Sequence, residues 1–164
     1  MTSIFSCRGD NGIDGKDGKD GANGQPGANG NANVVISVWK KPTNTKDTII
    51  DASNMKVATV TAPELKPEMV GNAAIFVYLN YGEGTFPLPH VSNAGGRVST
   101  VNFFPQKFKI RPTRFTHDNS NAAGFSSVVE FRYIIIPSGT GNKSASQVDY
   151  NDYESVKKFY NLKD

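Results

Sequence analysis

The side chains with the widest chemical use in this sequence are one thiol, Cys7, and two imidazoles, His90 and His117. A catalytic triad needs a histidine beside a nucleophile and an acid, and a zinc or copper site needs several histidine or cysteine ligands at close spacing. The two histidines are far apart, they flank turn-forming residues and are expected to be exposed, and no Gly-x-Ser-x-Gly nucleophile motif is present. We therefore predict no catalytic residues, no metal site, no cofactor and no enzymatic activity.

A glycine occupies every third position from Gly9 to Gly30. This is the collagen pattern, because three polyproline-II-like chains wind around an axis that has no room for a Cβ atom. Pro26 is the only proline in the run, so a trimer would need support from the domain that follows. Two alternatives stay open, a homotrimeric triple helix and a flexible polar linker. In either form, residues 9–32 act as a collagen-like spacer.

Residues 1–8 precede this repeat and contain the single cysteine of the chain. Ile4-Phe5-Ser6-Cys7 resembles the end of a bacterial lipoprotein signal peptide, in which a small residue precedes the lipidated cysteine. Six residues are too few for the charged and apolar parts of such a peptide, so we expect the rest of it upstream of Met1. The alternative is an ordinary exposed thiol. Since a cysteine ahead of a spacer and a domain is well placed for an anchor, Cys7 is the predicted lipidation site, and residues 1–8 are the signal-peptide remnant.

The order of these features resembles the collagen-like lipoproteins of Bacteroidetes bacteria. The resemblance rests on the Phe-Ser-Cys start, the charged Gly-x-Asp triplets, the junction Gly30-Asn31-Ala32-Asn33-Val34, and Asp-Tyr-x-x-Val-x-x-x-Tyr-x-Leu at residues 152–162. It implies a lipid-anchored protein at the bacterial outer membrane or cell surface. It supplies no catalytic residues, and the incomplete signal peptide is its one departure.

Residues 33–164 have the pattern of a single β-rich domain. Short apolar runs of strand length are separated by clusters of glycine, proline, asparagine and serine. This predicts a mainly β fold, a β-sandwich of jelly-roll or immunoglobulin-like type. Ala73–Leu79 is almost continuously apolar, so we expect that strand to be buried on both faces. The expected strands are Val34–Trp39, Val57–Thr61, Ala73–Leu79, Arg97–Phe104, Lys107–Ile110 and Ser126–Ile136, the last containing the strongest apolar run, Phe131–Ile136. A short turn or a single helical turn is expected between Pro63 and Pro67.

The end of the chain predicts a short C-terminal helix. Asn151 or Asp152 can cap its first turn, and two lysines suit its last turn. Tyr153, Val156 and Tyr160 fall on one side of such a helix. We expect this side to dock on the sandwich.

Two groups of residues are candidates for ligand binding. Lys107, Lys109 and Arg111 alternate with Phe108 and Ile110, which in a strand would place three cations on one face. That face would suit an anionic glycan or lipopolysaccharide, or it is simply the solvated face of an edge strand. The net charge of +3 is too small to indicate nucleic acid.

Tyr81 and Phe86 form the second group, because they flank Gly82-Glu83-Gly84 in an expected loop, where they could stack on a sugar. Most other aromatic side chains, Trp39 among them, are expected in the core. The leading hypothesis is a non-enzymatic surface lipoprotein, whose collagen-like stalk presents a β-sandwich head for structural, adhesive or ligand-binding use. The alternative is a carbohydrate-binding module of a surface glycan-handling system.

Overall fold

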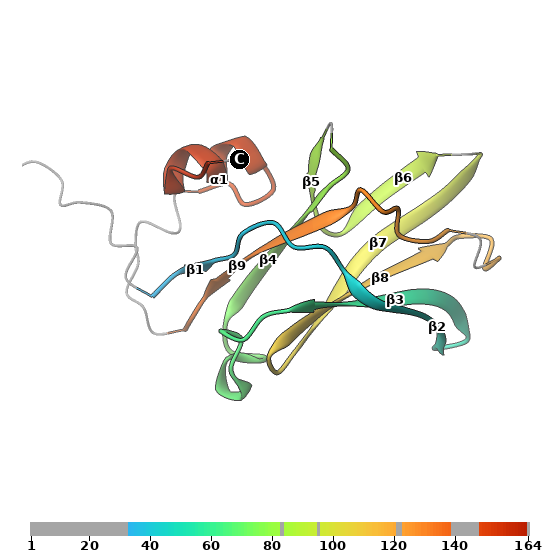
Figure 1. Cartoon of the computed structure of the whole chain (residues 1–164), viewed down its shortest axis with the longest axis horizontal. Coiled ribbons are helices and arrows are strands. Elements are labelled where there is room, and N and C mark those ends of the chain that lie inside the picture. The colour runs from blue at the N-terminus through green and yellow to red at the C-terminus, as the bar shows by residue number, and fades with distance from the viewer. Residues whose placement is uncertain (1–32, 83, 95, 121–122, 139–147, 164) are drawn as a thin grey trace, which may run out of the picture.

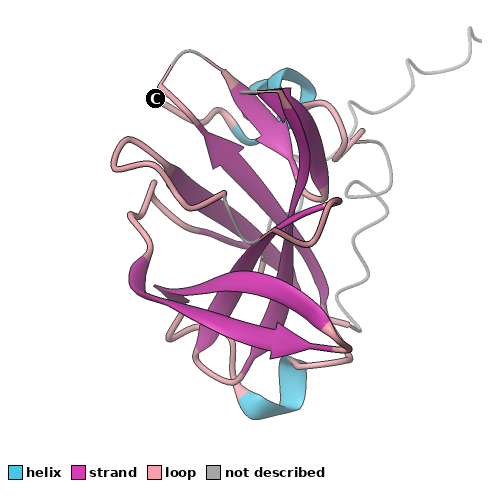
Figure 2. Cartoon of the chain, turned by 90° about the vertical axis from the view of Figure 1, so that its right-hand side faces the viewer, coloured by secondary structure: helices cyan, strands magenta, loops and turns pink. Residues whose placement is uncertain are grey.

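The computed structural model describes residues 33–82, 84–94, 96–120, 123–138 and 148–163. The predictions for residues 1–8, for the repeat at 9–32 and for Cys7 fall outside the described residues. The described part contains two antiparallel sheets and one short α-helix (Figures 1 and 2). This confirms the prediction of a mainly β fold. No helix in this part is long and apolar enough to span a membrane.

The first sheet has four strands in the order β1-β9-β4-β5. Its central pair, β4 and β9, places Val77 opposite Tyr133 and Leu79 opposite Phe131. These strands come from the two most apolar runs of the sequence. Apolar residues suit both of their faces, because the second sheet covers one face and the helix covers the other. The predicted burial of β4 on both faces is confirmed at its centre. The bounds are β1 (Val35–Ile36), β4 (Ala74–Asn80), β5 (Thr85–Pro87) and β9 (Glu130–Ile136).

The second sheet has five strands in the order β2-β3-β8-β7-β6. Val60, Val101 and Ile110 project from it towards the first sheet and are at most 1% exposed. One core is therefore shared by both sheets, an arrangement compatible with the predicted β-sandwich. The bounds are β2 (Thr43–Ile50), β3 (Ser53–Thr61), β6 (His90–Ala94), β7 (Arg97–Gln106) and β8 (Lys109–Thr116).

The C-terminal helix α1 (Tyr153–Tyr160) begins at Asp152, whose side chain accepts a hydrogen bond from the backbone N–H of Glu154 at 3.1 Å. Tyr153 and Val156 are 5% and 0% exposed and pack on the outer face of the four-stranded sheet. The predicted helix and its docking side are confirmed. A turn at Pro63 and Glu64 lies within the predicted proline-flanked segment, and a shorter 3-10 helix, η1 (Pro67–Met69), follows it. The two helices lie at opposite edges of the molecule (Figures 1 and 2).

The predicted strand over Lys107–Ile110 is wrong in its first half. Lys107 and Phe108 form the turn that joins β7 to β8, where Gln106 pairs with Lys109. Phe108 has a φ of 62°, a left-handed conformation that ends the alternation of a strand. Phe108 is therefore exposed where Ile110 is buried, and the expected row of three cations on one strand face does not form.

Candidate functional site

A groove of about 740 Å³ lies between the start of α1 and one end of the first sheet. Its floor includes a row of three side chains on neighbouring strands, because Asn80 pairs with both Thr85 and Glu130. Paired residues of antiparallel strands project from the same face. Trp39 and Asp152 also line the groove, which we call the Trp39 groove.

The helix explains where the groove ends. The next row of the same sheet face is Pro87, Tyr78 and Arg132, and here Tyr153 of α1 covers the sheet. The Tyr153 ring lies 5.0 Å from that of Tyr78, and its hydroxyl accepts a hydrogen bond from Arg132 Nη1. The row Thr85, Asn80 and Glu130, by contrast, lies beyond the start of the helix and lines the open groove.

Arg132 fixes the tryptophan at the side of the groove. Its guanidinium carbon lies 4.7 Å from the centroid of the Trp39 ring, a cation–π contact. The Trp39 and Tyr153 rings are also in contact, with centroids 5.7 Å apart. Arg132 is only 6% exposed, and its Nε has no hydrogen-bond partner among the described residues. The ring is therefore held by packing before any ligand arrives.

The chemical character of the groove is aromatic and hydrogen-bonding, with an excess of acid. Among the lining residues that the structure describes, carboxylates come from Glu130, Asp152 and Glu154, and Lys157 is the one cationic side chain. Amide groups come from asparagines, and one hydroxyl comes from a threonine. In the described part of the chain, no three histidine, cysteine or acidic side chains are grouped as they would be around a metal ion. Such a surface suits a small polar ligand with one apolar face.

The structure brings the two predicted aromatic candidates together, but away from this groove. The rings of Tyr81 and Phe86 are 6.3 Å apart, and Phe86 stacks on His90 at 4.3 Å. Phe86 lies in β5, so its predicted loop position is wrong. Thr85 and Pro87 line the groove, and Phe86 between them projects to the other side of the strand.

The predicted exposure of His90 is also wrong, because it begins β6 and is half-buried. Burial lowers the pKa of its imidazole below 6.5, and the positive charge of Arg114 lowers this pKa further. His117 is exposed, as predicted, and its Nε2 lies 2.8 Å from the hydroxyl of Thr100. The two histidines occupy different surroundings and form no common site.

The predicted cations are divided between two places. Lys107 and Lys109 line a second cavity, of about 720 Å³, at the tip of the β7–β8 hairpin. Arg111 lies farther along β8 and donates from Nε to the backbone oxygen of Ala58 at 3.2 Å. Their role in binding remains a prediction.

The sequence gives little indication that the residues of the Trp39 groove form a common site. Trp39 is the only tryptophan and follows an apolar run, which is why it was expected in the core. Asn80 and Glu130 stand where two apolar runs meet polar residues. Their proximity depends on the pairing of β4 with β9, which no local pattern reveals.

No protein-family model matches the chain, and neither a curated protein nor a solved structure matches it.

Proposed function

We propose that the chain is a non-enzymatic, lipid-anchored surface protein that binds a saccharide in the Trp39 groove. Cys7 carries the anchor, residues 9–32 form the collagen-like stalk, and residues 33–164 form a β-sandwich head of jelly-roll or immunoglobulin-like type. The Gly-x-y repeat and the lipoprotein-like Phe-Ser-Cys start support the stalk and the anchor. The groove supports the binding role.

The observation that carries this proposal is the uncovered row Thr85, Asn80 and Glu130 beside the held ring of Trp39. A sugar ring has one or two faces of C–H groups, which pack on an aromatic ring, and hydroxyls at its edge, which bond to carboxylates and amides. The groove offers both kinds of contact next to each other. This arrangement favours the carbohydrate-binding hypothesis over a purely structural head.

The charges of the groove narrow the class of saccharide. Among the described residues, three carboxylates line the groove against Lys157 and the buried guanidinium of Arg132 behind Trp39, and this excess of negative charge repels a uronic acid or a sulfated sugar. A neutral or amine-bearing saccharide avoids this repulsion, and its hydroxyl or ammonium donors match carboxylate acceptors. We therefore assign the groove to neutral or amino sugars.

Binding of the full chain to immobilised neutral, amino and acidic polysaccharides tests the assignment. Trp39→Phe keeps a ring against Arg132, and Glu130→Gln keeps the side-chain shape, so neither change should unfold the head. Each is expected to weaken binding to the neutral or amino sugar about tenfold. Glu68→Gln, on the exposed η1 turn, is the matched control. Equal binding by all three variants would remove the groove from the proposal, and loss on changing Tyr81 or Phe86 to Ala would move the site to those residues.

The anchor and the stalk need their own test. Expression in a bacterium behind a complete lipoprotein signal peptide, with an alkyne-labelled fatty acid, should label the parent and leave Cys7→Ser unlabelled. The mass of the unlabelled protein by analytical ultracentrifugation then separates a trimeric stalk from a monomer with a linker. Labelling of both proteins would contradict the assignment of Cys7.

A further inference from the structure

The tip of the β7–β8 hairpin holds an aromatic side chain outward in an unfavourable backbone conformation. Phe108 is 49% exposed and has a φ of 62°, a region that bulky side chains rarely adopt. Two backbone hydrogen bonds fix it there, from Phe108 N–H to Leu65 O at 2.7 Å and from Ala62 N–H to Phe108 O at 2.9 Å. Strain that is held in place by surrounding structure is typical of functional positions.

Three lysines lie near Phe108 in the fold. Lys107 and Lys109 flank it and line with it the cavity of about 720 Å³ described above, whose apolar part includes Pro67 and Val70. Lys66 is exposed and follows Leu65, whose carbonyl accepts the hydrogen bond from Phe108 N–H. We call these six residues the Phe108 patch.

The acids near the patch do not cancel its charge. Glu68 is exposed on η1, and Glu64 accepts a hydrogen bond from the hydroxyl of Tyr133 at 2.7 Å. Lys40 Nζ donates to the same hydroxyl at 3.2 Å, so a further cation stands close to Glu64. The patch thus combines an exposed apolar ring with a local excess of positive charge.

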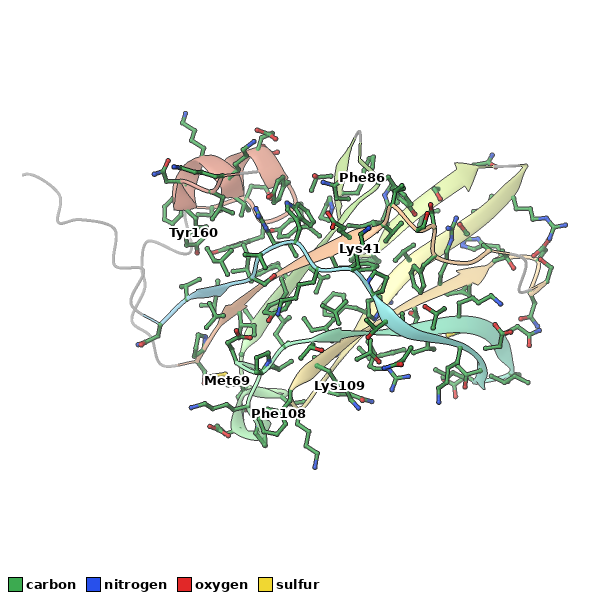
Figure 3. The ribbon with its side chains drawn as sticks, viewed as in Figure 1. Lys41, Met69, Phe86, Phe108, Lys109 and Tyr160 are labelled. Atoms are coloured by element: carbon green, nitrogen blue, oxygen red, sulfur yellow. The ribbon has the colours of Figure 1, made fainter. Side chains whose placement is uncertain are left out.

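The patch is at the end of the head where the N-terminal part of the chain joins it. Asn33, the first described residue, lines a cavity of about 580 Å³ together with Lys66 and Met69. Figure 3 shows Met69, Phe108 and Lys109 together at one edge of the molecule, with Phe86 and Tyr160 towards the opposite edge. The Trp39 groove lies beside α1, which is also at that opposite edge (Figure 1).

We propose that the Phe108 patch docks the head on an anionic lipid bilayer. The phenyl ring enters the boundary between headgroups and acyl chains, while the three lysines contact anionic headgroups. The Trp39 groove then faces away from the bilayer. A second copy of the chain is a poorer partner, because a symmetric contact would oppose like charges. A soluble polyanion would leave the exposed phenyl ring without a partner.

Co-sedimentation with vesicles tests this docking. The full chain with Cys7→Ser, which cannot be acylated, is mixed with vesicles of phosphatidylcholine alone or with added phosphatidylglycerol. We expect binding only to the anionic vesicles, and weaker binding at high salt. Lys107→Ala and Lys109→Ala should each reduce partitioning about fivefold. Phe108→Gly, in which the glycine accepts the left-handed backbone, should reduce it about tenfold.

The control variants alter matched residues at the far end of the sheet, Lys46→Ala and Ile49→Ala on β2. They should bind as the parent does, and circular dichroism should show every variant folded. Undiminished binding by Phe108→Gly, or equal binding to both vesicle types, would overturn the proposal. Binding to heparin without binding to vesicles would also overturn the proposal. The same holds if the protein is an oligomer that dissociates when Phe108 is changed. Saccharide binding is measured on the same variants. It shows whether the proposed saccharide binding in the Trp39 groove or the proposed bilayer docking of the Phe108 patch has failed.

Discussion

The guanidinium carbon of Arg132 lies 4.7 Å from the centroid of the Trp39 ring, on the outer face of the four-stranded sheet. The same side chain donates to the hydroxyl of Tyr153 in α1 and to the backbone oxygen of Lys163, the latter at 3.4 Å. One buried charge thus connects β9, the segment after β1 and the C-terminal helix. The side wall of the Trp39 groove therefore depends on Arg132.

The first prediction concerns this connection. Arg132→Lys keeps the charge, but a single ammonium group cannot both cover the Trp39 ring and reach two acceptors. We expect the free energy of unfolding to fall by about 2 kcal/mol, as measured by urea denaturation. Arg97→Lys, at an arginine side chain 49% exposed, is the matched control and should change stability by less than about 0.5 kcal/mol. Equal effects of the two changes would show that the contacts of Arg132 contribute little.

A second prediction concerns the polar network of Lys40, Tyr133 and Glu64. Burial raises the pKa of the Tyr133 hydroxyl above its usual value, and so does the hydrogen bond to Glu64. The hydroxyl therefore remains a donor to Glu64 across the neutral range. Tyr133→Phe should cost about 1 kcal/mol of stability, and Glu64→Gln should have little further effect in that background. A double-mutant cycle in urea measures this coupling, and fully additive effects would contradict it.

The sequence predicts those elements of the fold whose burial is local. The runs Ala73–Leu79 and Phe131–Ile136 form β4 and β9 because they are apolar on both faces, and apolar composition needs no partner to be recognised. The helix is equally local, since a cap, its charges and the spacing of Tyr153 and Val156 all lie within a few turns. The bounds of β4 and of the helix were predicted nearly correctly. The strand expected over Ser126–Ile136 begins only at Glu130, and the strand expected over Val34–Trp39 is reduced to Val35–Ile36.

The remaining features depend on contacts distant in sequence. β2 is missed because its residues are mostly polar and exposed, and it becomes a strand by pairing with β3. Phe108 is misplaced because hydrogen bonds to Ala62 and Leu65 stabilise its left-handed turn. The groove is missed for the same reason, since Asn80 and Glu130 become neighbours only through the register of two strands.

The third prediction concerns the pH dependence of stability. The folded pKa of His90 lies below 6.5, chiefly through burial, so between these two pKa values the unfolded chain binds more protons than the folded chain. Stability should therefore decrease as the pH falls through about 6.5 and level off below the folded pKa of His90. Thermal melts of the parent and of His90→Asn, above the range where carboxylates titrate, measure this effect.

The slope should be smaller in His90→Asn than in the parent. Proton NMR of the two histidines gives the titration directly, with His117→Asn used to assign the signals. A His90 midpoint at or above 6.5 would contradict the prediction.

The last prediction separates the two roles of Asp152, which caps α1 and also lines the Trp39 groove. Asparagine is as good a cap as aspartate, whereas alanine has no acceptor. Asp152→Ala should therefore reduce stability by about 1 kcal/mol, and Asp152→Asn by only a few tenths. If the carboxylate also receives a hydrogen bond from the saccharide, Asp152→Asn should weaken saccharide binding about as much as Asp152→Ala does. Unfolding in urea and binding to the immobilised sugar, measured on both variants, distinguish the roles: a loss of affinity that follows the loss of stability would leave Asp152 as a cap alone.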